Sequence, residues 1–142
     1  TGDIGYVDAN GYVHILGRAS DCYIACDGKK YYLFDTKAVI LQDDAVFQCE
    51  VVNVTVDSAQ RLIAHIILDK GVFGDDIQRI ITRIHALCKA KLPVHAIPYA
   101  YKLREDFPVS ENSNKKDMHK LKTDFEGLIF AHELDAKNWE SD

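Results

Sequence analysis

Four cysteines and six histidines are the side chains of this sequence best suited to redox chemistry or metal binding. The cysteines are Cys22, Cys26, Cys49 and Cys88. They contain no CxxC pair, so their spacing predicts neither a disulfide framework nor a zinc site, and we expect buried, reduced thiols. The histidines do not cluster. His85 and His132 accompany apolar helical patterns, which predicts partly buried, hydrogen-bonded structural roles and no metal site.

Acidic and basic residues in four short stretches are the remaining candidates for chemistry. Asp3 and Arg18 flank an expected hairpin, Gly28 precedes Lys29 in an expected turn, and Lys115 lies in a polar stretch. An ionised carboxylate accepts several hydrogen bonds, and an arginine offers a planar fork of donors. Each residue also has a plain structural interpretation: a solvated strand end for Asp3 and Arg18, a tight turn for Gly28 and Lys29, and a solvated lysine pair for Lys115.

The composition is that of an ordinary globular protein. Its 142 residues are enough for one domain with its own core, and 47% of them are hydrophobic while 27% are charged. A formal net charge of −5 argues against nucleic acid or an anionic membrane surface as a partner. No apolar run reaches the length of a membrane span, and the expected reduced thiols indicate the cytoplasm.

Hydrophobic patterning and turn residues predict a series of strands and helices. Residues 8–11 (Asp-Ala-Asn-Gly) supply the turn of a first hairpin. Alternating apolar residues predict a longer antiparallel pair, and three-and-four spacing predicts helices. In chain order we expect strands Ile4–Val7, Tyr12–Leu16, Asp21–Cys26 and Lys29–Tyr32, helix Phe34–Gln42, strands Val46–Asp57 and Arg61–Asp69, a helix capped by Asp75 or Asp76 and ended before Pro93, strand Pro98–Arg104, a loop Glu105–Lys116, and a helix with Met118, Leu121, Phe125, Leu128, Ile129 and His132 on one face.

This order predicts an α+β fold, in which helices pack on a small, mostly antiparallel sheet that a β-hairpin precedes. Such an architecture does not by itself indicate a function. A strand pattern begins within a few residues of Thr1 without an initiator methionine, and we therefore expect the chain to be a fragment.

Four stretches taken together carry a family resemblance. They are Thr1-Gly2-Asp3, the hairpin ending in Leu16-Gly17-Arg18, the segment Asp21–Tyr32 with its Gly-Lys turn, and the lysine-bearing loop before Asp117. In this order and spacing they resemble the C-terminal part of the adenylate-forming enzymes, which include acyl-CoA synthetases, peptide-synthetase adenylation domains and luciferases. The resemblance extends to about Leu121. It is greatest to acyl-CoA ligases of the long-chain type, although Leu33 stands where their proline is expected.

The resemblance implies a division of the chain and a set of roles. Residues 1–19 correspond to the last hairpin and hinge of a large N-terminal domain, and residues 20–142 to a small mobile C-terminal domain. The family forms an acyl-adenylate from a carboxylic acid and ATP, and a thiol then displaces AMP. The implied roles are ribose binding for Asp3, ribose or phosphate binding for Arg18, the hinge for Ser20 or Asp21, and the turn of the thiol step for Gly28 and Lys29.

A catalytic lysine is also implied, in the loop Phe107–Asp117. In the family this lysine bridges the substrate carboxylate and the α-phosphate of ATP, where negative charge develops. Counting forward from Pro108 places Asn114 at its position, whereas counting back from Asp117 places Lys115 there. We favour Lys115, because a one-residue insertion in a loop costs little.

The resemblance further implies cofactors and partners. ATP and Mg²⁺ would serve the full-length enzyme, an acid-thiol ligase, while the fragment alone would be inactive and bind neither. Its partners would be the missing N-terminal domain and the thiol of CoA or of a carrier protein. The alternative is a non-catalytic, ligase-derived interaction module that has lost the lysine. The open edge of the hairpin also predicts pairing with a second copy of the chain.

Overall fold

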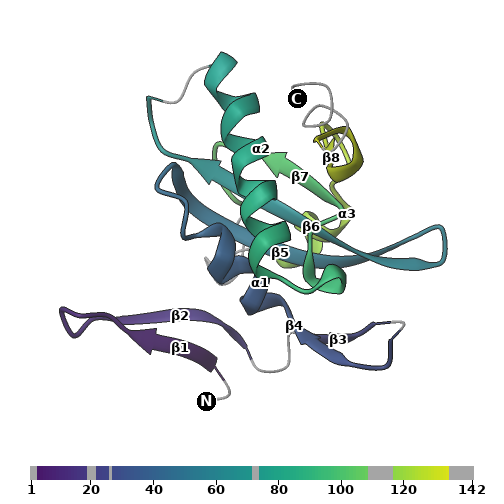
Figure 1. The fold of residues 1–142 in the computed structure, drawn as a ribbon, viewed down its shortest axis with the longest axis horizontal. Helices are drawn as coiled ribbons and strands as arrows, with labels where there is room; N and C mark the ends of the chain where they lie inside the picture. The colour runs from purple at the N-terminus through teal and green to yellow at the C-terminus, as the bar shows by residue number, and fades with distance from the viewer. Residues whose placement is uncertain (1–2, 19–21, 26, 72–73, 109–116, 135–142) are drawn as a thin grey trace.

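The structure, a computed structural model, describes residues 3–18, 22–25, 27–71, 74–108 and 117–134, and it gives the backbone alone at residues 3–4, 14–18, 74–75 and 118. Its elements run along the chain as shown in Figure 1. They are β1 (Asp3–Val7), β2 (Val13–Arg18), β3 (Cys22–Ile24), β4 (Lys30–Tyr32), α1 (Leu33–Ile40), β5 (Val46–Val56), β6 (Ala59–Leu68), α2 (Gly74–Lys91), the 3-10 turn η1 (Val94–Ala96), β7 (Ala100–Leu103), α3 (Met118–Thr123) and β8 (Ile129–Phe130).

The central sheet has the strand order β5-β6-β7-β8. β5 pairs antiparallel with β6 and β7 pairs antiparallel with β8, whereas β6 and β7 are parallel. Parallel neighbours need a long crossover, which α2 and η1 supply. β1 with β2 and β3 with β4 form two separate antiparallel hairpins. The predicted α+β fold with a mostly antiparallel sheet is confirmed.

Both faces of the central sheet are covered. On one face α1 and α2 bury an apolar cluster, and Figure 1 shows α2 lying across the strands. Alternate residues of β6, such as Ala64 and Ile66, belong to this cluster. On the other face Ile63 of β6 packs in a smaller cluster with Phe107 and with Leu121 of α3. The period of two along β6 therefore explains how one strand serves two cores.

The prediction of one long helix after Asp117 is wrong. α3 ends at Thr123, and Asp124 is extended, with φ −93° and ψ 100°. Gly127 then takes a φ of +67°, and Ile129 and Phe130 form the short strand β8 beside β7. Asp124 forms ion pairs with Lys102 of β7 and with Arg104, which directly follows β7, and these favour its extended conformation. The positive φ at Gly127 is not compatible with a continuous helix.

The described cysteines and histidines mostly follow expectation. Cys49 and Cys88 are buried and Cys22 is half-buried, and none of the three forms a disulfide. His85 is buried, with its Nδ1 2.8 Å from the Tyr101 hydroxyl, as predicted. The prediction for His132 is wrong, because its ring is exposed and stacks on Phe130. Burial raises the pKa of Cys88 to about 11. The fourth cysteine, Cys26, lies outside the described residues.

The predicted cap of α2 is also wrong. The helix begins at Gly74, one residue before Asp75, so both aspartates lie in its first turn. Asp76 is exposed there and approaches Arg79 at 4.0 Å. None of the described helices is long and apolar enough to span a bilayer.

Candidate functional site

The first hairpin brings Asp3 and Arg18 together. Asp8 starts its turn by accepting hydrogen bonds from the backbone of Asn10 at 2.9 Å and of Tyr12 at 3.1 Å. Gly11 completes the turn with a φ of +87°, which a glycine adopts without strain. A shift of register between Ile4 and Gly5 then makes Asp3 and Arg18 direct partners at the open end of the hairpin. The backbone therefore places an acidic and a basic residue side by side.

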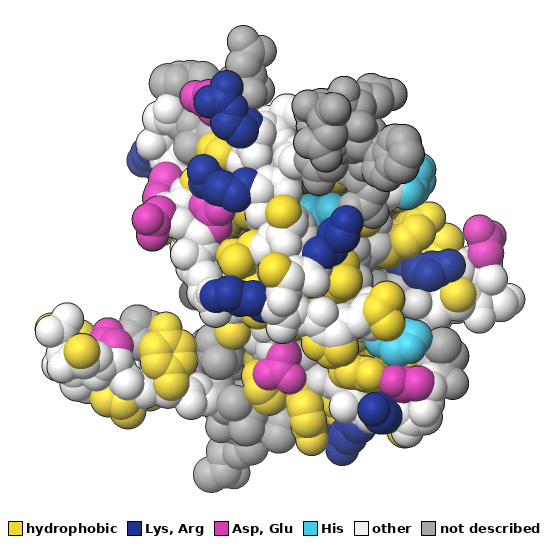
Figure 2. All heavy atoms as spheres, viewed as in Figure 1, with side chains coloured by type: hydrophobic (Ala, Val, Ile, Leu, Met, Phe, Trp, Pro, Cys, Tyr) yellow, Lys and Arg dark blue, Asp and Glu magenta, His cyan; other side chains and the backbone are white. Residues whose placement is uncertain are grey.

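The same hairpin exposes several large apolar side chains. Tyr12 and Val13 are 69% and 68% exposed, and Tyr6 and Val7 on the opposing strand are more than half exposed. Figure 2 shows apolar side chains on the part of the molecule at the lower left, which the hairpin forms. Val7 and Val13 are direct partners across the hairpin, and exposed large apolar side chains of this kind are often found at an interface with another domain or protein.

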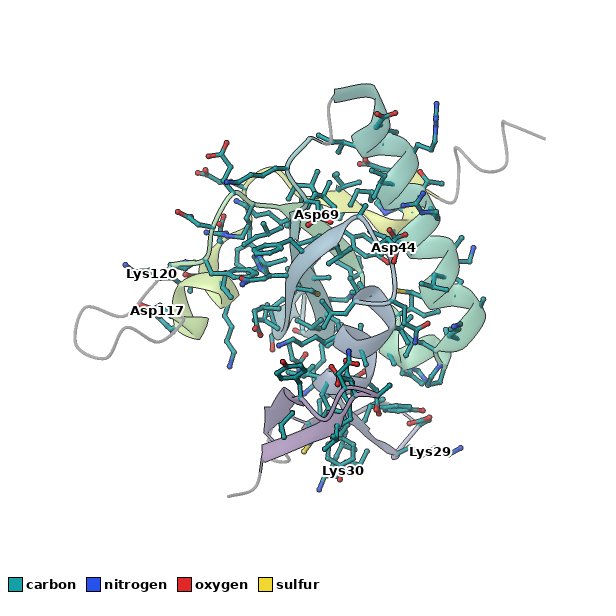
Figure 3. All side chains as sticks on the ribbon, turned by 90° about the vertical axis from the view of Figure 1, so that its left-hand side faces the viewer. Lys29, Lys30, Asp44, Asp69, Asp117 and Lys120 are labelled. Carbon is teal, nitrogen blue, oxygen red and sulfur yellow. The ribbon has the colours of Figure 1, made fainter. Side chains whose placement is uncertain are left out.

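The turn at Gly28 is closed by backbone hydrogen bonds. The amide of Ala25 donates to the Lys29 carbonyl at 3.0 Å, and the Gly28 amide donates to the Ala25 carbonyl at 2.9 Å. Gly28 takes a φ of +81°, which confirms that this residue occupies a tight turn. The Lys29 side chain is exposed at the edge of the molecule (Figure 3). A cation at this turn is therefore free to reach a partner in solution.

Asp27 stabilises this turn from within. Its carboxylate accepts hydrogen bonds from the Tyr31 hydroxyl at 2.6 Å and from the Lys29 amide at 2.9 Å. The Tyr31 bond is the main cause that lowers the pKa of Asp27. His95 of η1 approaches the same carboxylate at 3.8 Å.

One hydroxyl group of the β3-β4 hairpin and one of α1 donate hydrogen bonds to η1. The Tyr23 hydroxyl donates to the His95 carbonyl at 2.5 Å, and Thr36 of α1 donates to the Ala96 carbonyl at 2.7 Å. Burial, followed by the nearby Tyr31, raises the pKa of Tyr23 to about 12, so the hydroxyl keeps its proton and stays a donor. The turn at Gly28 thus projects from a fixed base.

The predicted catalytic residue Lys115 and the alternative position Asn114 lie outside the described residues, as do Ser20 and Asp21. The two ends of the lysine-bearing stretch are described. The Asp117 amide donates to the Pro108 carbonyl at 2.7 Å, and the Asp117 carboxylate caps α3 by accepting from the Lys120 amide at 3.2 Å. The residues on either side of the stretch are thus joined by a hydrogen bond.

Among the described residues, the Gly28 turn and the end of the lysine-bearing stretch at Asp117 lie apart. Figure 3 shows Lys29 at one end of the molecule and Asp117 with Lys120 on a different side. Within the described part of the chain no set of three or more His, Cys, Asp or Glu residues could hold a metal ion.

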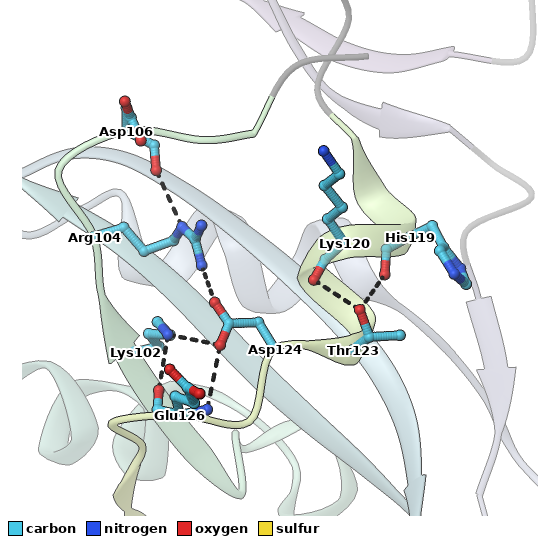
Figure 4. Close-up of polar contacts among 8 residues, drawn as sticks. All are labelled: Lys102, Arg104, Asp106, His119, Lys120, Thr123, Asp124 and Glu126. Carbon is cyan, nitrogen blue, oxygen red and sulfur yellow. Dashed lines mark hydrogen bonds and ion pairs between the residues drawn. The ribbon is translucent and has the colours of Figure 1, made fainter. Parts of the chain in front are cut away.

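Sequence reasoning missed an ionic cluster after α3, shown in Figure 4. Asp124 accepts from Lys102 at 2.7 Å and from Arg104 at 2.6 Å, both on or next to β7. Arg104 also donates to the Asp106 carbonyl at 3.0 Å, and Lys102 donates to the Glu126 carbonyl at 2.8 Å. No local pattern indicates this cluster, because twenty residues separate Arg104 from Asp124.

Curated relatives of this chain are ligases. A 2-succinylbenzoate–CoA ligase of Bacillus cereus (strain ATCC 10987) is 33% identical over 117 residues, which cover 82% of this chain and 22% of the relative. A ligase of the same name from Bacillus licheniformis is 30% identical over 122 residues and covers 85% of this chain. No family model matches the chain.

Solved structures of larger proteins also resemble this chain. An anthranilate–CoA ligase in complex with anthranoyl-AMP superposes with a TM-score of 0.65 at 25% identity, over 87% of this chain and 23% of the ligase. ATP-bound MatB from Rhodopseudomonas palustris superposes with a TM-score of 0.61 at 25% identity, over 86% of this chain and 23% of MatB. The chain spans less than a quarter of the length of each relative named above.

Proposed function

Because this chain belongs to the adenylate-forming superfamily, as a counterpart of the C-terminal domain of these ligases, we propose that it serves a whole enzyme that couples a carboxylic acid to a thiol. The observation that carries the proposal is the 33% identity to a CoA ligase over 82% of the chain. In this reaction the acid first attacks ATP to give an acyl-adenylate and pyrophosphate, and the thiol then displaces AMP. The chain alone is expected to be inactive.

Asp3 and Arg18 are the proposed nucleotide-binding residues. Their direct pairing across the hairpin supports this role, because both can then contact one ribose and its neighbouring phosphate. A carboxylate accepts hydrogen bonds from the ribose hydroxyls, and an arginine donates to hydroxyl or phosphate oxygens. The ATP-bound solved relative is consistent with nucleotide use.

Lys115 is the proposed catalytic residue of adenylation. Its ammonium group would lie between the attacking carboxylate and the α-phosphate and stabilise the charge that develops there. Support comes from the described ends of its stretch, since the Asp117–Pro108 hydrogen bond holds the two flanking segments together. Counting back from Asp117 keeps Lys115, rather than Asn114, at the matching position.

Gly28 and Lys29 are the proposed residues of the thiol step. The fixed base of β3-β4 and the positive φ at Gly28 support a rigid turn whose glycine allows a thiol arm to approach closely. Ser20 or Asp21 is the proposed hinge, since both lie between β2 and β3 in the chain. Rotation there would exchange the lysine loop for the Gly28 turn at one active site.

Further partners and cofactors follow from the same proposal. The exposed apolar side chains of the β1-β2 hairpin fit a contact with the large N-terminal domain. ATP and Mg²⁺ would bind mainly to that domain, and the described residues here provide no set of metal ligands. The thiol belongs to CoA or to a carrier protein. The buried thiols of Cys49 and Cys88, neither of which forms a disulfide, fit the proposed cytoplasmic location.

The proposal is tested in the full-length protein by measuring the two half-reactions separately. Lys115→Ala should reduce acid-dependent exchange of pyrophosphate into ATP by about 10²-fold or more, as the loss of one charge-stabilising group does elsewhere. Thioester formation from supplied acyl-adenylate should remain within a few-fold of wild type. Lys116→Ala is the matched control and should leave both half-reactions near wild type.

Three other results would change the assignment. If Lys116→Ala, and not Lys115→Ala, abolished exchange, the catalytic lysine would be misplaced by one residue. Equal losses in both half-reactions for Lys115→Ala would contradict a role specific to adenylation. A folded, ATP-binding wild-type protein with no exchange for any acid would favour the non-catalytic interaction module.

A further inference from the structure

Arg104 connects the two chain segments that flank the lysine-bearing stretch. Its Nε donates to the carbonyl of Asp106, which lies two residues before Pro108 on the incoming side. Its Nη1 donates to the carboxylate of Asp124, which directly follows α3 on the outgoing side. One planar guanidinium therefore holds both segments at fixed relative positions (Figure 4).

A second cation reinforces this connection from β7. Lys102 donates to the Asp124 carboxylate at 2.7 Å and to the Glu126 carbonyl at 2.8 Å. The side chains of Lys102, Arg104 and Asp124 are 17%, 16% and 23% exposed, so solvent screens the cluster less than it screens a surface pair. Burial opposes ionisation of Asp124, but the hydrogen bonds from Lys102 and Arg104 outweigh it and lower the pKa of Asp124 to about 2.

The segments that this cluster joins are also packed on the sheet. Leu121 of α3 is fully buried, and it lies in one apolar cluster with Phe107 of the incoming segment. The Asp117–Pro108 hydrogen bond lies at the far end of both segments from Arg104. The geometry is that of a clamp with a buried apolar contact in the middle and a polar connection at each end.

We propose that Arg104 and Asp124 are positioning residues for adenylation. They fix the positions of Pro108 and Asp117, and thereby help to position the proposed catalytic residue Lys115. This inference rests on the proposed function. Lys115 is two residues from Asp117, a span of at most about 7 Å. A misplacement of about 1 Å at a catalytic group can cost about 10²-fold in rate.

Figure 3 shows Lys120 of α3, the helix that Asp124 follows, apart from Lys29 of the Gly28 turn, and the effect of the cluster should therefore be confined to one half-reaction. Asp124→Asn keeps the shape of the side chain but weakens both charge-assisted hydrogen bonds. Arg104→Lys keeps one cation beside Asp124 but loses the fork that also reaches Asp106. Asp43→Asn is the matched control, because Asp43 forms an ion pair with Arg83 at 2.7 Å on another part of the domain.

The first readout is the ratio of the half-reactions in the full-length protein. We expect Asp124→Asn to lower pyrophosphate exchange about 10- to 100-fold while thioester formation from supplied acyl-adenylate changes less than threefold. Arg104→Lys should show the same pattern to a smaller extent. Asp43→Asn should lower neither rate selectively. Equal losses in both half-reactions for Asp124→Asn would overturn the inference and leave a structural role alone.

The second readout does not depend on activity. In Asp124→Asn the Asp117 amide, which donates to Pro108, should exchange its hydrogen at least tenfold faster, while amides in the middle of α2 stay at wild-type rates. Unchanged exchange at Asp117 would overturn the clamp even in an active enzyme. A wild-type protein without pyrophosphate exchange would instead refute the proposed function, and the amide measurement would still decide whether the clamp exists.

Discussion

His65 makes the stability of this domain depend on pH in a way that one substitution can remove. The side chain is fully buried on β6, and neither ring nitrogen has a hydrogen-bond partner among the described residues. Its neighbours on the adjacent strands are Glu50 of β5 and Lys102 of β7. Burial is the main cause that lowers the pKa of His65 from 6.5 to about 4. The positive charges of Arg104 and Lys102 lower this pKa further, whereas Asp124 raises it. The Leu121 backbone also raises it, although it makes no hydrogen bond with the ring.

The direction of this pH dependence follows from which state, folded or unfolded, binds the proton more tightly. Between pH 6.5 and about 4 the unfolded histidine is protonated and the folded one is neutral, so protons favour the unfolded state. The contribution of His65 to stability is therefore constant above pH 7 and falls as the pH drops toward 4. A lowering of the pKa from 6.5 to about 4 corresponds to a total loss of about 3 kcal/mol.

His65→Leu replaces the ring by an apolar side chain beside Ile63 and Ile67 of the same strand face. At pH 7 we expect a gain of about 1 kcal/mol, because two unpaired buried nitrogens disappear. At pH 4.5 the gain over wild type should widen by about 2–3 kcal/mol. Urea unfolding of both proteins at pH 7.5, 6, 5 and 4.5 measures this difference, with His119→Leu on the exposed face of α3 as the control. Parallel pH profiles for wild type and His65→Leu would refute the reasoning.

Three further predictions concern the turn, the core and the hairpin. Gly28→Ala should cost about 1–2 kcal/mol of stability in urea unfolding, because its φ is +81° although space for a Cβ is open; no loss would contradict the turn geometry. Leu121→Ala should cost about 2–5 kcal/mol by creating a cavity under α3, whereas Lys120→Ala at the exposed face should change stability by less than about 0.5 kcal/mol; similar values for both would contradict the packing of α3. The free edge of the β1-β2 hairpin should make the isolated chain self-associate, and a monomer at every concentration in sedimentation would remove this prediction.

Local signals were sufficient for much of the fold. The turn at residues 8–11 predicted the first hairpin, whereas the pairing of Asp3 with Arg18 also depends on a shift of register between Ile4 and Gly5. Alternation predicted β5 and β6, and three-and-four spacing predicted α2. These elements depend on residues close in the chain, and their prediction from sequence succeeded for that reason.

Long-range contacts account for what the sequence did not reveal. The apolar residues between Leu121 and His132 have helical spacing, yet the ion pairs of Asp124 with Lys102 and Arg104 favour an extended chain and the short strand β8. The parallel pairing of β6 with β7 likewise depends on the crossover through α2 rather than on either strand. The sequence did not predict the clamp around Arg104 for the same reason, because the residues that form it come together only in the folded domain.

The most direct test of the central claim is carboxylate-dependent exchange of labelled pyrophosphate into ATP by the full-length protein that contains this chain. The panel should include short, long and aromatic acids, with 2-succinylbenzoate and anthranilate among them because ligases similar to this chain are named for these acids. We predict exchange with at least one acid and its loss in Lys115→Ala. Absence of exchange with every acid, in a protein that is folded and binds ATP, would contradict the account.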